Sequence, residues 1–472
     1  MIFSSFEFLL FFLPPVWLGF LGLRRLKLES AAIGFLLVVS WVFYAAWRPY
    51  YLPVLLGSIV VNYSIGHLIY RGSGKRWLYV GVTFNLLLLG VFKYLDFLLA
   101  DVLGLQLALN IALPLAISFF TFQQIAWLVD LYQGRVDLPT KSRYGFFVSF
   151  FPQLIAGPIV HAREVLPQLG SGWLRRPLPL SLGITLLVIG LAKKVLIADV
   201  LAPGVDSLFL QASNGITFNL LDTLAAAIGY GVQLYFDFSG YADMAIGLGL
   251  LFGIALPDNF RSPYKAASII EFWRCWHITL SKFLRDYLYI PLGGNRRGPL
   301  RRQINLLVTM LLGGIWHGAG WQFLIWGGIH GALLVGNHWW RALAPWQMPV
   351  FVARFITLAC VMLAWIFFRA DNAKVACHVL AGLLEMPQAW SPDWHGVFMA
   401  FIDVSTSGQS GAGVLLPMSL AGLALALVAP GSRQLGERFS PLMRGLFSGV
   451  LLMMVLKTLT ERPDRAFLYF NF

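Results

Sequence analysis

The sequence predicts an all-α, polytopic integral membrane protein with roughly 10 to 13 transmembrane helices. Of its 472 residues, 58% are hydrophobic and only 12% are charged, whereas soluble domains carry about 25% charged residues. Many windows of about 18 to 20 residues contain few or no charges, as a membrane-spanning helix requires. These runs are continuously apolar and do not alternate, which argues against a transmembrane β-barrel.

The apolar runs extend along the whole chain. Segments 144–158, 241–256 and 264–290 are apolar but interrupted by polar residues, so we expect re-entrant or interfacial helices there. We find no internal repeat and no soluble linker, which favours a single membrane domain over residues 1–472 with core motifs at about 111–340. The expected spans are about 7–23, 31–47, 51–70, 77–100, 111–132, 178–198, 218–234, 303–319, 322–340, 350–368, 411–429 and 443–458.

The connecting loops predict the orientation. There are 35 Lys and Arg against 22 Asp and Glu, a net charge of +13, and this excess sits in loops, where the positive-inside rule explains it without nucleic acid. The first three basic loops are separated by two spans each, so they share one side. We expect that side to be cytoplasmic and the N-terminus to face outward. The basic loops are Arg24–Lys27, Arg71–Arg76, Gly134–Arg143 and Gly293–Arg302.

Polar side chains inside apolar runs are the candidate functional residues, because they are costly in a bilayer. In "QLYFDFSGYADMAIGLG", Asp237, Ser239 and Asp243 interrupt an aromatic run, and "FSGY" predicts a helix break. These side chains either line a substrate path or serve a structural role. In the structural alternative they cap helix ends or pair with a buried cation.

The segment "EFWRCWHITLSKFLRDYLYIPLGGN" predicts an amphipathic helix, either interfacial or lining a cavity. We expect an ion pair between Glu271 and Arg274, three residues apart. His277 lies at the edge of the polar stripe, where a structural and a functional role both remain open. The stripe consists of Glu271, Arg274, His277 or Ile278, Ser281 and Arg285.

The stretch "MLLGGIWHGAGW" places His317 fourteen residues after Gln303, where the span begins. At 1.5 Å per residue this is roughly 20 Å into a core of about 30 Å. Burial disfavours the imidazolium, so we expect a neutral imidazole, which is a competent general base. The surrounding glycines allow close approach of backbone or substrate. The alternative is a histidine that only packs between helices, which we expect of His330 and His338.

Several motifs together resemble the membrane-bound O-acyltransferase family, and most closely its bacterial branch that contains the alginate O-acetyltransferase membrane subunit. The resemblance extends over essentially the whole chain. Its motifs are "FPQLIAGPIV", "QLYFDFSGYADMAIGLG", "PDNFRSPY", "EFWRCWHITLSKFLRDYLYIPLGGN" and "LLGGIWHGAGWQFLIWGGIHG", with "MIFSSFEFLLFFLPP" at the start, "LPLAISFFTFQQIAWLVDLY" between and "FLYFNF" at the end.

The resemblance implies a catalytic role for two histidines. His317 matches the invariant histidine of the family, and His277 matches its second polar position. Cys275 departs from the pattern, because relatives usually carry "FWRRWH" there. Trp316 and Asn295 lie in the same motifs and are added to Asp237, Ser239, Asp243, Glu271, Arg274 and Ser281 as tunnel-lining or supporting residues.

The resemblance also implies the reaction and its setting. An acyl group leaves a cytoplasmic thioester, acetyl-CoA as the donor, and passes through a central tunnel to a hydroxyl. Extracytoplasmic acetyl-relay or acetyltransferase proteins and export machinery complete the transfer at a bacterial inner membrane, with no bound cofactor or metal. The basic loop either attracts the phosphates of acetyl-CoA or only sets topology; its arginines are Arg296, Arg297, Arg301 and Arg302.

Two classes of function therefore remain. The first is an O-acetyltransferase whose final acceptor is an exported polysaccharide such as alginate or cellulose, or a cell-wall polymer such as peptidoglycan or teichoic acid. The second is a transporter or flippase of an acyl or glycan precursor, which would also need polar residues at membrane depth.

Overall fold

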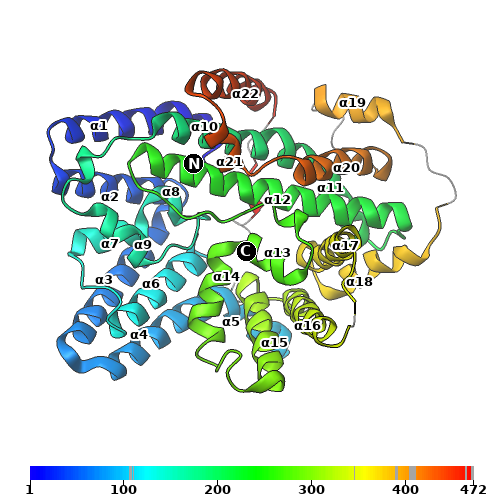
Figure 1. The fold of residues 1–472 in the computed structure, drawn as a ribbon, viewed down its shortest axis with the longest axis horizontal. Helices are drawn as coiled ribbons and strands as arrows, with labels where there is room; N and C mark the ends of the chain where they lie inside the picture. The colour runs from blue at the N-terminus through cyan, green and yellow to red at the C-terminus, as the bar shows by residue number, and fades with distance from the viewer. Residues whose placement is uncertain are drawn as a thin grey trace. The chain divides into compact units, whose positions relative to one another are not determined.

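The computed structural model describes residues 1–105, 109, 111–344, 346–387, 392–402, 411–462 and 465–468. Helices make up the architecture of these residues, and they contain no β-strand. The predicted all-α class is confirmed (Figure 1).

Among the described residues, six helical segments are long and apolar enough to cross a membrane, or up to seven if a pair bent by 58° is one span. This is fewer than the number expected from apolar runs. Helix α2 (Glu29–Ala45) has only 17 residues, and α15 (Gly298–His317) and α16 (Trp321–Leu343) contain arginines and histidines. The six are Glu7–Arg25, Pro49–Gly72, Gly74–Val102, Leu180–Ser213, Val350–Arg369 and Pro441–Glu461; the bent pair is α20 (Ala412–Val428) with α21 (Ser432–Arg438).

The chain forms two compact units, each assembled from separate stretches. The first contains residues 1–189, 241–258 and 439–448. Its core is aromatic: the Phe151 ring lies 5.5 Å from that of Phe43 and 5.7 Å from that of Phe252. Its main helices are α1 (Leu13–Arg25), α2, α3 (Leu52–Leu68), α4 (Gly74–Leu89), α6 (Ile117–Tyr132), α7 (Lys141–Ser149), α8 (Phe151–Leu154), α9 (Ala162–Val165) and most of α10 (Leu180–Ala192).

The segment "FPQLIAGPIV" does not form a continuous helix, because its two prolines interrupt helical hydrogen bonding. The helix ends at Ser149, α8 lasts four residues, and the backbone from 150 to 162 is buried throughout. The Phe151 backbone N–H donates to Ser40 Oγ at 3.0 Å. The Gln153 side-chain amide donates to the Phe147 carbonyl at 2.6 Å. Irregular backbone is thus supplied with hydrogen-bond partners inside the unit, as an apolar environment demands.

The second unit contains residues 190–240, 259–438 and 449–472. It holds both histidines of interest, on elements between α13 and α16. Its main helices are α11 (Asp199–Ser213), the first part of α12 (Leu220–Leu251), α13 (Ile269–Cys275), α14 (Ile278–Leu284), α15, α16, α17 (Val350–Arg369), α18 (Ala373–Ala381), α19 (Trp394–Ile402), α20 and most of α22 (Pro441–Glu461).

Helix α12 corrects the expected break at "FSGY". It runs without interruption for 32 residues. Gly240 meets a neighbouring segment there, because a Cβ at this position would lie 2.8 Å from the Gly190 carbonyl oxygen. Gly240 therefore permits close packing against the neighbouring segment around Gly190 and does not end the helix.

Helices α15 and α16 form a tightly packed hairpin, visible in the lower part of Figure 1. A Cβ on Gly314 would overlap the Phe323 carbonyl oxygen, and one on Gly327 would overlap the Met310 carbonyl oxygen. Backbone thus meets backbone at this crossing, which small residues alone permit.

We expect Gly327→Ala to destabilise the hairpin by about 1–3 kcal/mol, because a methyl group must displace the Met310 carbonyl. Gly336→Ala is the matched control in the same helix, since no atom lies within 4 Å of its Cβ position. Thermal unfolding in detergent should show a lower midpoint for Gly327→Ala only. Equal midpoints for the two variants would refute the close crossing.

Candidate functional site

His317 is the last residue of α15, and its side chain is buried. The chain leaves the helix at Gly318, which is extended, and α16 begins at Trp321. The C-terminus of a helix carries partial negative charge, so it stabilises an imidazolium formed there. The helix terminus therefore offsets part of the free-energy cost that burial adds to protonation of the His317 imidazole.

Three aromatic rings surround the His317 imidazole. The ring centroids of Trp316, Phe368 and Trp326 lie 4.9, 5.0 and 5.1 Å away. All three pairs are steeply inclined, between 69° and 86°. The imidazole is thus enclosed by aromatic rings on several sides, and their packing fixes its position.

His277 lies in a break between two short helices. Helix α13 ends at Cys275, α14 begins at Ile278, and His277 itself has a left-handed φ of 42°. The expected continuous amphipathic helix is therefore wrong at this point. A non-glycine residue in this conformation costs on the order of 1–3 kcal/mol, and such strain gathers at functional sites.

Asn259 fixes the tautomer of His277. Its Oδ1 accepts hydrogen bonds from the Thr279 backbone N–H at 3.2 Å and the Thr279 hydroxyl at 2.9 Å. The same oxygen lies 3.2 Å from His277 Nδ1. Since a backbone N–H can only donate, this atom is the carbonyl oxygen, and Nδ1 must carry the proton. In the neutral ring, Nε2 is then an acceptor.

His277 is fully buried and lies outside the candidate membrane spans. Burial lowers its pKa to about 3. The imidazole is therefore neutral at physiological pH, and its Nε2 can accept a proton or a hydrogen bond.

Trp316 links the two histidines. Its ring centroid lies 4.9 Å from that of His317 and 6.2 Å from that of His277. The structure thus brings together two buried imidazoles that are forty residues apart in sequence. His330 belongs to the same aromatic cluster, 4.8 Å from Trp326 between ring centroids, in the packing environment expected of it.

The glycines near His317 allow other protein atoms to approach closely, which is one of the two uses expected of them. A Cβ on Gly318 would overlap the Phe323 ring, and one on Gly320 would overlap the Gln322 side chain. The glycines accommodate neighbouring protein atoms, as Gly314 does at the helix crossing. They do not provide open space for a substrate.

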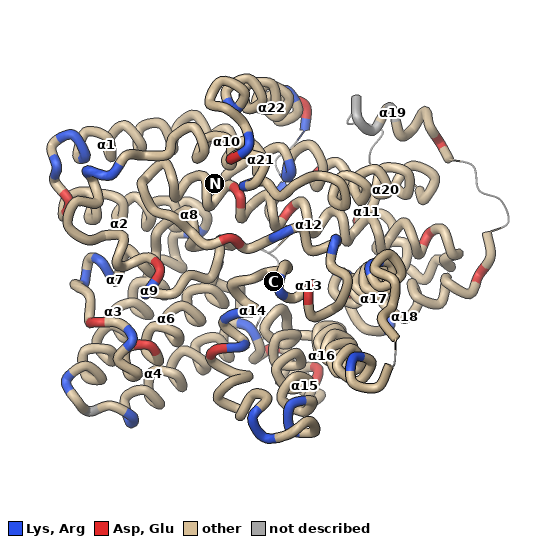
Figure 2. The backbone as a smooth tube through the Cα atoms, viewed as in Figure 1, with Lys and Arg blue, Asp and Glu red and all other residues tan. Residues whose placement is uncertain are grey.

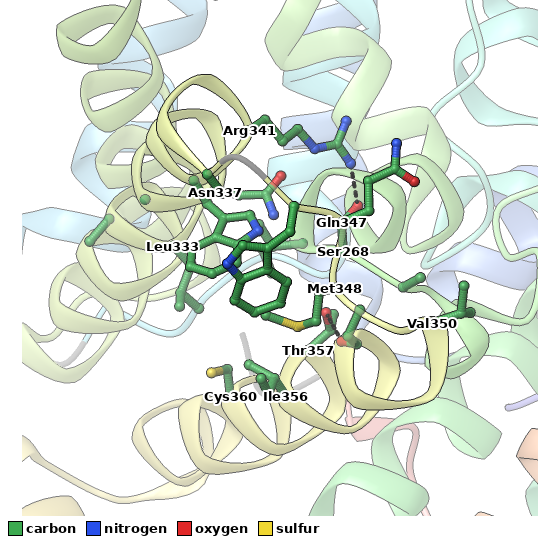
Figure 3. A pocket seen from close by; sticks show the side chains of 18 of the residues that line it. Ser268, Leu333, Asn337, Arg341, Gln347, Met348, Val350, Ile356, Thr357 and Cys360 are labelled. Carbon is green, nitrogen blue, oxygen red and sulfur yellow. Dashed lines mark hydrogen bonds between the residues drawn. The ribbon is translucent and has the colours of Figure 1, made fainter.

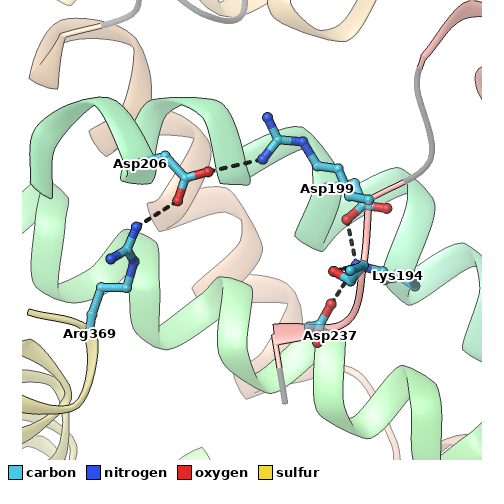
Figure 4. A network of polar contacts seen from close by, with 7 residues as sticks. Lys194, Asp199, Asp206, Asp237 and Arg369 are labelled. Atoms are coloured by element: carbon cyan, nitrogen blue, oxygen red, sulfur yellow. Dashed lines mark hydrogen bonds and ion pairs between the residues drawn. The ribbon is translucent and has the colours of Figure 1, made fainter. Parts of the chain in front are cut away.

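Asp237 and Ser239 belong to a buried charge network, in keeping with the structural alternative. Asp237 and Lys194 form an ion pair of 2.7 Å with both side chains 2% exposed, and Lys194 also pairs with Asp199 at 2.7 Å (Figure 4). Ser239 accepts a hydrogen bond from Lys193 at 3.2 Å. The ring of Phe238, which lies between Asp237 and Ser239 in sequence, packs on His277 with ring centroids 4.8 Å apart.

The same network holds a segment near the C-terminus. The Leu468 backbone N–H donates to Asp237 at 3.0 Å, and Lys194 donates to the Ala466 carbonyl at 3.3 Å. Lys194 also lies 4.8 Å from the centre of the Phe467 ring. A second chain of ion pairs joins Asp206 to Arg369 at 2.8 Å and to Arg465 at 3.0 Å.

The other expected supporting residues lie elsewhere. Glu271, Arg274 and Asn295 are exposed. Glu271 accepts a hydrogen bond from the Ala267 backbone at 2.8 Å and so helps to begin α13, in place of the expected pair with Arg274. Ser281 donates to the Trp276 carbonyl at 3.3 Å. Asp243 belongs to the first unit.

The basic loop forms the turn before α15, where Figure 2 shows clustered Lys and Arg positions. Arg296, Arg297 and Arg301 are exposed, whereas Arg302 is half-buried. Arg301 precedes His317 by sixteen helical residues, or roughly 24 Å. These arginines therefore cannot touch an acyl group held at the imidazole, although a long donor molecule could contact both.

Sequence reasoning missed Asn259, Trp326 and Phe368. Asn259 stands eighteen residues before His277, and no continuous helix joins the two, so helical spacing could not predict their contact. Trp326 and Phe368 have the appearance of ordinary apolar positions in their helices. Among the described residues, no group of His, Cys, Asp and Glu side chains could hold a metal ion.

Similarity to known proteins identifies the family independently of the site geometry. Residues 138–379 match the model of the membrane-bound O-acyltransferase family. The chain is 43% identical over 426 residues to a peptidoglycan O-acetyltransferase of Helicobacter pylori, covering 82% of this chain and 80% of that protein. It is 42% identical over 395 residues to a probable alginate O-acetylase AlgI of Pseudomonas aeruginosa, covering 80% and 73%. A teichoic acid D-alanyltransferase of Bacillus subtilis is 29% identical over 237 residues, covering 48% of this chain and 59% of that protein.

The buried network gives a stability prediction. Lys194→Met should destabilise the fold by about 3–5 kcal/mol, because it leaves buried carboxylates without their cation. Lys457→Met is the matched control: Lys457 is 72% exposed and lies 3.9 Å from Glu461, so its loss should cost at most about 1 kcal/mol. Thermal unfolding in detergent measures both, and similar midpoints would contradict the assignment.

Proposed function

Because the chain belongs to the membrane-bound O-acyltransferase family, we propose that it takes an acetyl group from cytoplasmic acetyl-CoA and delivers it for O-acetylation of an exported polysaccharide. Relatives named as O-acetyltransferases support O-acyl transfer as the reaction. The single observation that carries the catalytic assignment is the burial of His317 at a helix C-terminus, one tryptophan ring away from His277. A pure transporter moves its substrate without cleaving a thioester, so it needs no general base.

His317 acts as the general base. The attacking hydroxyl gives its proton to the imidazole as its oxygen bonds to the thioester carbonyl carbon. The C–S bond then breaks, and the imidazolium returns the proton to the leaving thiolate. The helix C-terminus stabilises the transient imidazolium.

His277 holds the acceptor hydroxyl. With its Nδ1–H directed to Asn259, a neutral His277 offers only Nε2, which accepts a hydrogen bond. This geometry supports positioning of a hydroxyl by His277 and not donation of a hydrogen bond to the thioester carbonyl. Asn259 is then a positioning residue that acts through His277.

The basic turn before α15 supports the donor assignment. Arg296, Arg297 and Arg301 are exposed and carry charge that attracts the phosphates of acetyl-CoA. The roughly 24 Å along α15 from Arg301 to His317 suits an extended donor whose acetyl end reaches the imidazole. In this proposal the turn faces the cytoplasm of an inner membrane, and the N-terminus faces the periplasm.

The acceptor polymer has two candidates. The alginate O-acetylase relatives favour alginate or a similar exopolysaccharide such as cellulose. In this proposal, extracytoplasmic proteins complete the transfer. The Helicobacter pylori relative favours peptidoglycan at similar identity. Deleting the gene and measuring ester-linked acetate in each isolated polymer distinguishes them, since only the true acceptor loses it.

We expect His317→Ala to lower acetyl transfer by about 10²–10⁴-fold without unfolding the protein, because a positioned base contributes that much. The assay is transfer from labelled acetyl-CoA in proteoliposomes. His338→Ala, in the neighbouring helix, serves as the control and should retain activity. A folded His317→Ala protein with normal transfer would sink the assignment.

Asn259→Asp tests the positioning role. A carboxylate beside Nδ1 raises the pKa of His277 from about 3 because it stabilises the imidazolium. His277 then protonates as pH falls and loses its Nε2 acceptor. The fall of kcat at low pH should therefore begin at a higher pH in the variant than in the parent.

The control for this profile is Thr279→Val, which removes one donor to Asn259 and leaves the His277 contact in place. Its pH profile should match that of the parent. A purely structural Asn259 would lower activity equally at every pH in the Asp variant.

A further inference from the structure

A groove of about 1020 Å³ lies between α16 and α17, beside the start of α13 (Figure 3). Its volume is at the upper end of the range for small-molecule sites, about 300–1,000 Å³. Its lining residues differ from those around the two imidazoles, so an acetyl-transfer mechanism leaves it unused. Apolar walls come from Ile329 and Leu333 on α16 and from Val350, Ile356 and Cys360 on α17.

The groove opens toward an apolar surface. Val350 and Ile356 line it and are still 57% and 45% exposed. Phe351 and Phe355 next to them are 75% and 71% exposed. Because α17 is apolar enough to cross a membrane, this surface faces acyl chains, and a chain can enter the groove from the side.

One end of the groove is polar and positively charged. The Arg341 guanidinium donates to Ser268 Oγ at 3.3 Å, and no carboxylate of the described residues forms an ion pair with it. The Arg341 guanidinium thus brings a positive charge to this end of the groove, and a positive charge attracts an anion.

The same end offers a hydrogen-bond acceptor. Asn337 Oδ1 is buried, and no donor among the described residues reaches it. Two tryptophans close this end, Trp340 and Trp346, with ring centroids 5.2 Å apart. Tryptophans gather at the level of lipid head groups, and basic pockets between membrane helices bind anionic head groups.

We propose that this groove binds an anionic glycerophospholipid with a hydroxyl-bearing head group, such as phosphatidylglycerol. The phosphate pairs with Arg341, a head-group hydroxyl donates to Asn337, and an acyl chain follows the α16–α17 wall. The lateral opening and the apolar lining favour a lipid over a nucleotide, whose several phosphates would need more than one cation. Because α16 also carries Trp326, the lipid would brace the helix that encloses His317.

The test uses the full-length protein purified in zwitterionic detergent. Phosphatidylglycerol, phosphatidylcholine, phosphatidic acid, coenzyme A and inorganic phosphate are added separately, and retained molecules are counted by native mass spectrometry. Phosphatidylglycerol should be retained and should raise the unfolding midpoint more than the others. Arg341→Gln should weaken its retention about tenfold, as loss of a charge-assisted contact predicts.

Two further variants sharpen the outcome. Arg354→Gln removes an exposed arginine of α17 outside the groove lining and should leave retention unchanged. Asn337→Leu should abolish the preference for phosphatidylglycerol over phosphatidic acid, which lacks the head-group hydroxyls. Equal retention of all lipids, equal loss in Arg341→Gln and Arg354→Gln, or retention of coenzyme A or phosphate in place of lipid would each overturn the proposal.

Discussion

The close crossing of α15 and α16 is the constraint on which the candidate site depends. Gly314 and Gly327 let backbone touch backbone, so the end of α15 cannot move independently of α16. That contact places Trp326 of α16 against His317 of α15. A looser hairpin would open the imidazole to other partners and weaken both the aromatic enclosure and the orientation of the ring.

The buried ion pairs of the second unit and its two candidate catalytic histidines have different surroundings. The cation Lys194 is buried with carboxylates on both sides, and this network supports the chain near Ala466. The two histidines instead sit among aromatic rings, where burial favours the neutral imidazole.

The all-helical membrane class was predictable because composition and continuous apolar runs decide it. His317 was recognisable from its depth along one continuous helix. The partners of the histidines were not, since Asn259, Trp326 and Phe368 reach them through tertiary packing that no local period records. Local reasoning also misjudged Gly240: a glycine that permits close packing inside a helix has the same sequence appearance as one that ends it.

The anchoring of Ala466 to Lys194 has a consequence for biogenesis. The two residues are 272 positions apart, and at about 5–20 residues per second their synthesis is separated by tens of seconds. During that interval Lys194 has only the neighbouring carboxylates to neutralise it, with Asp237 arriving well before Ala466. The carboxylates of Asp199 and Asp237 thus compensate the charge of Lys194 in the membrane until the segment around Ala466 has been synthesised and packs against it.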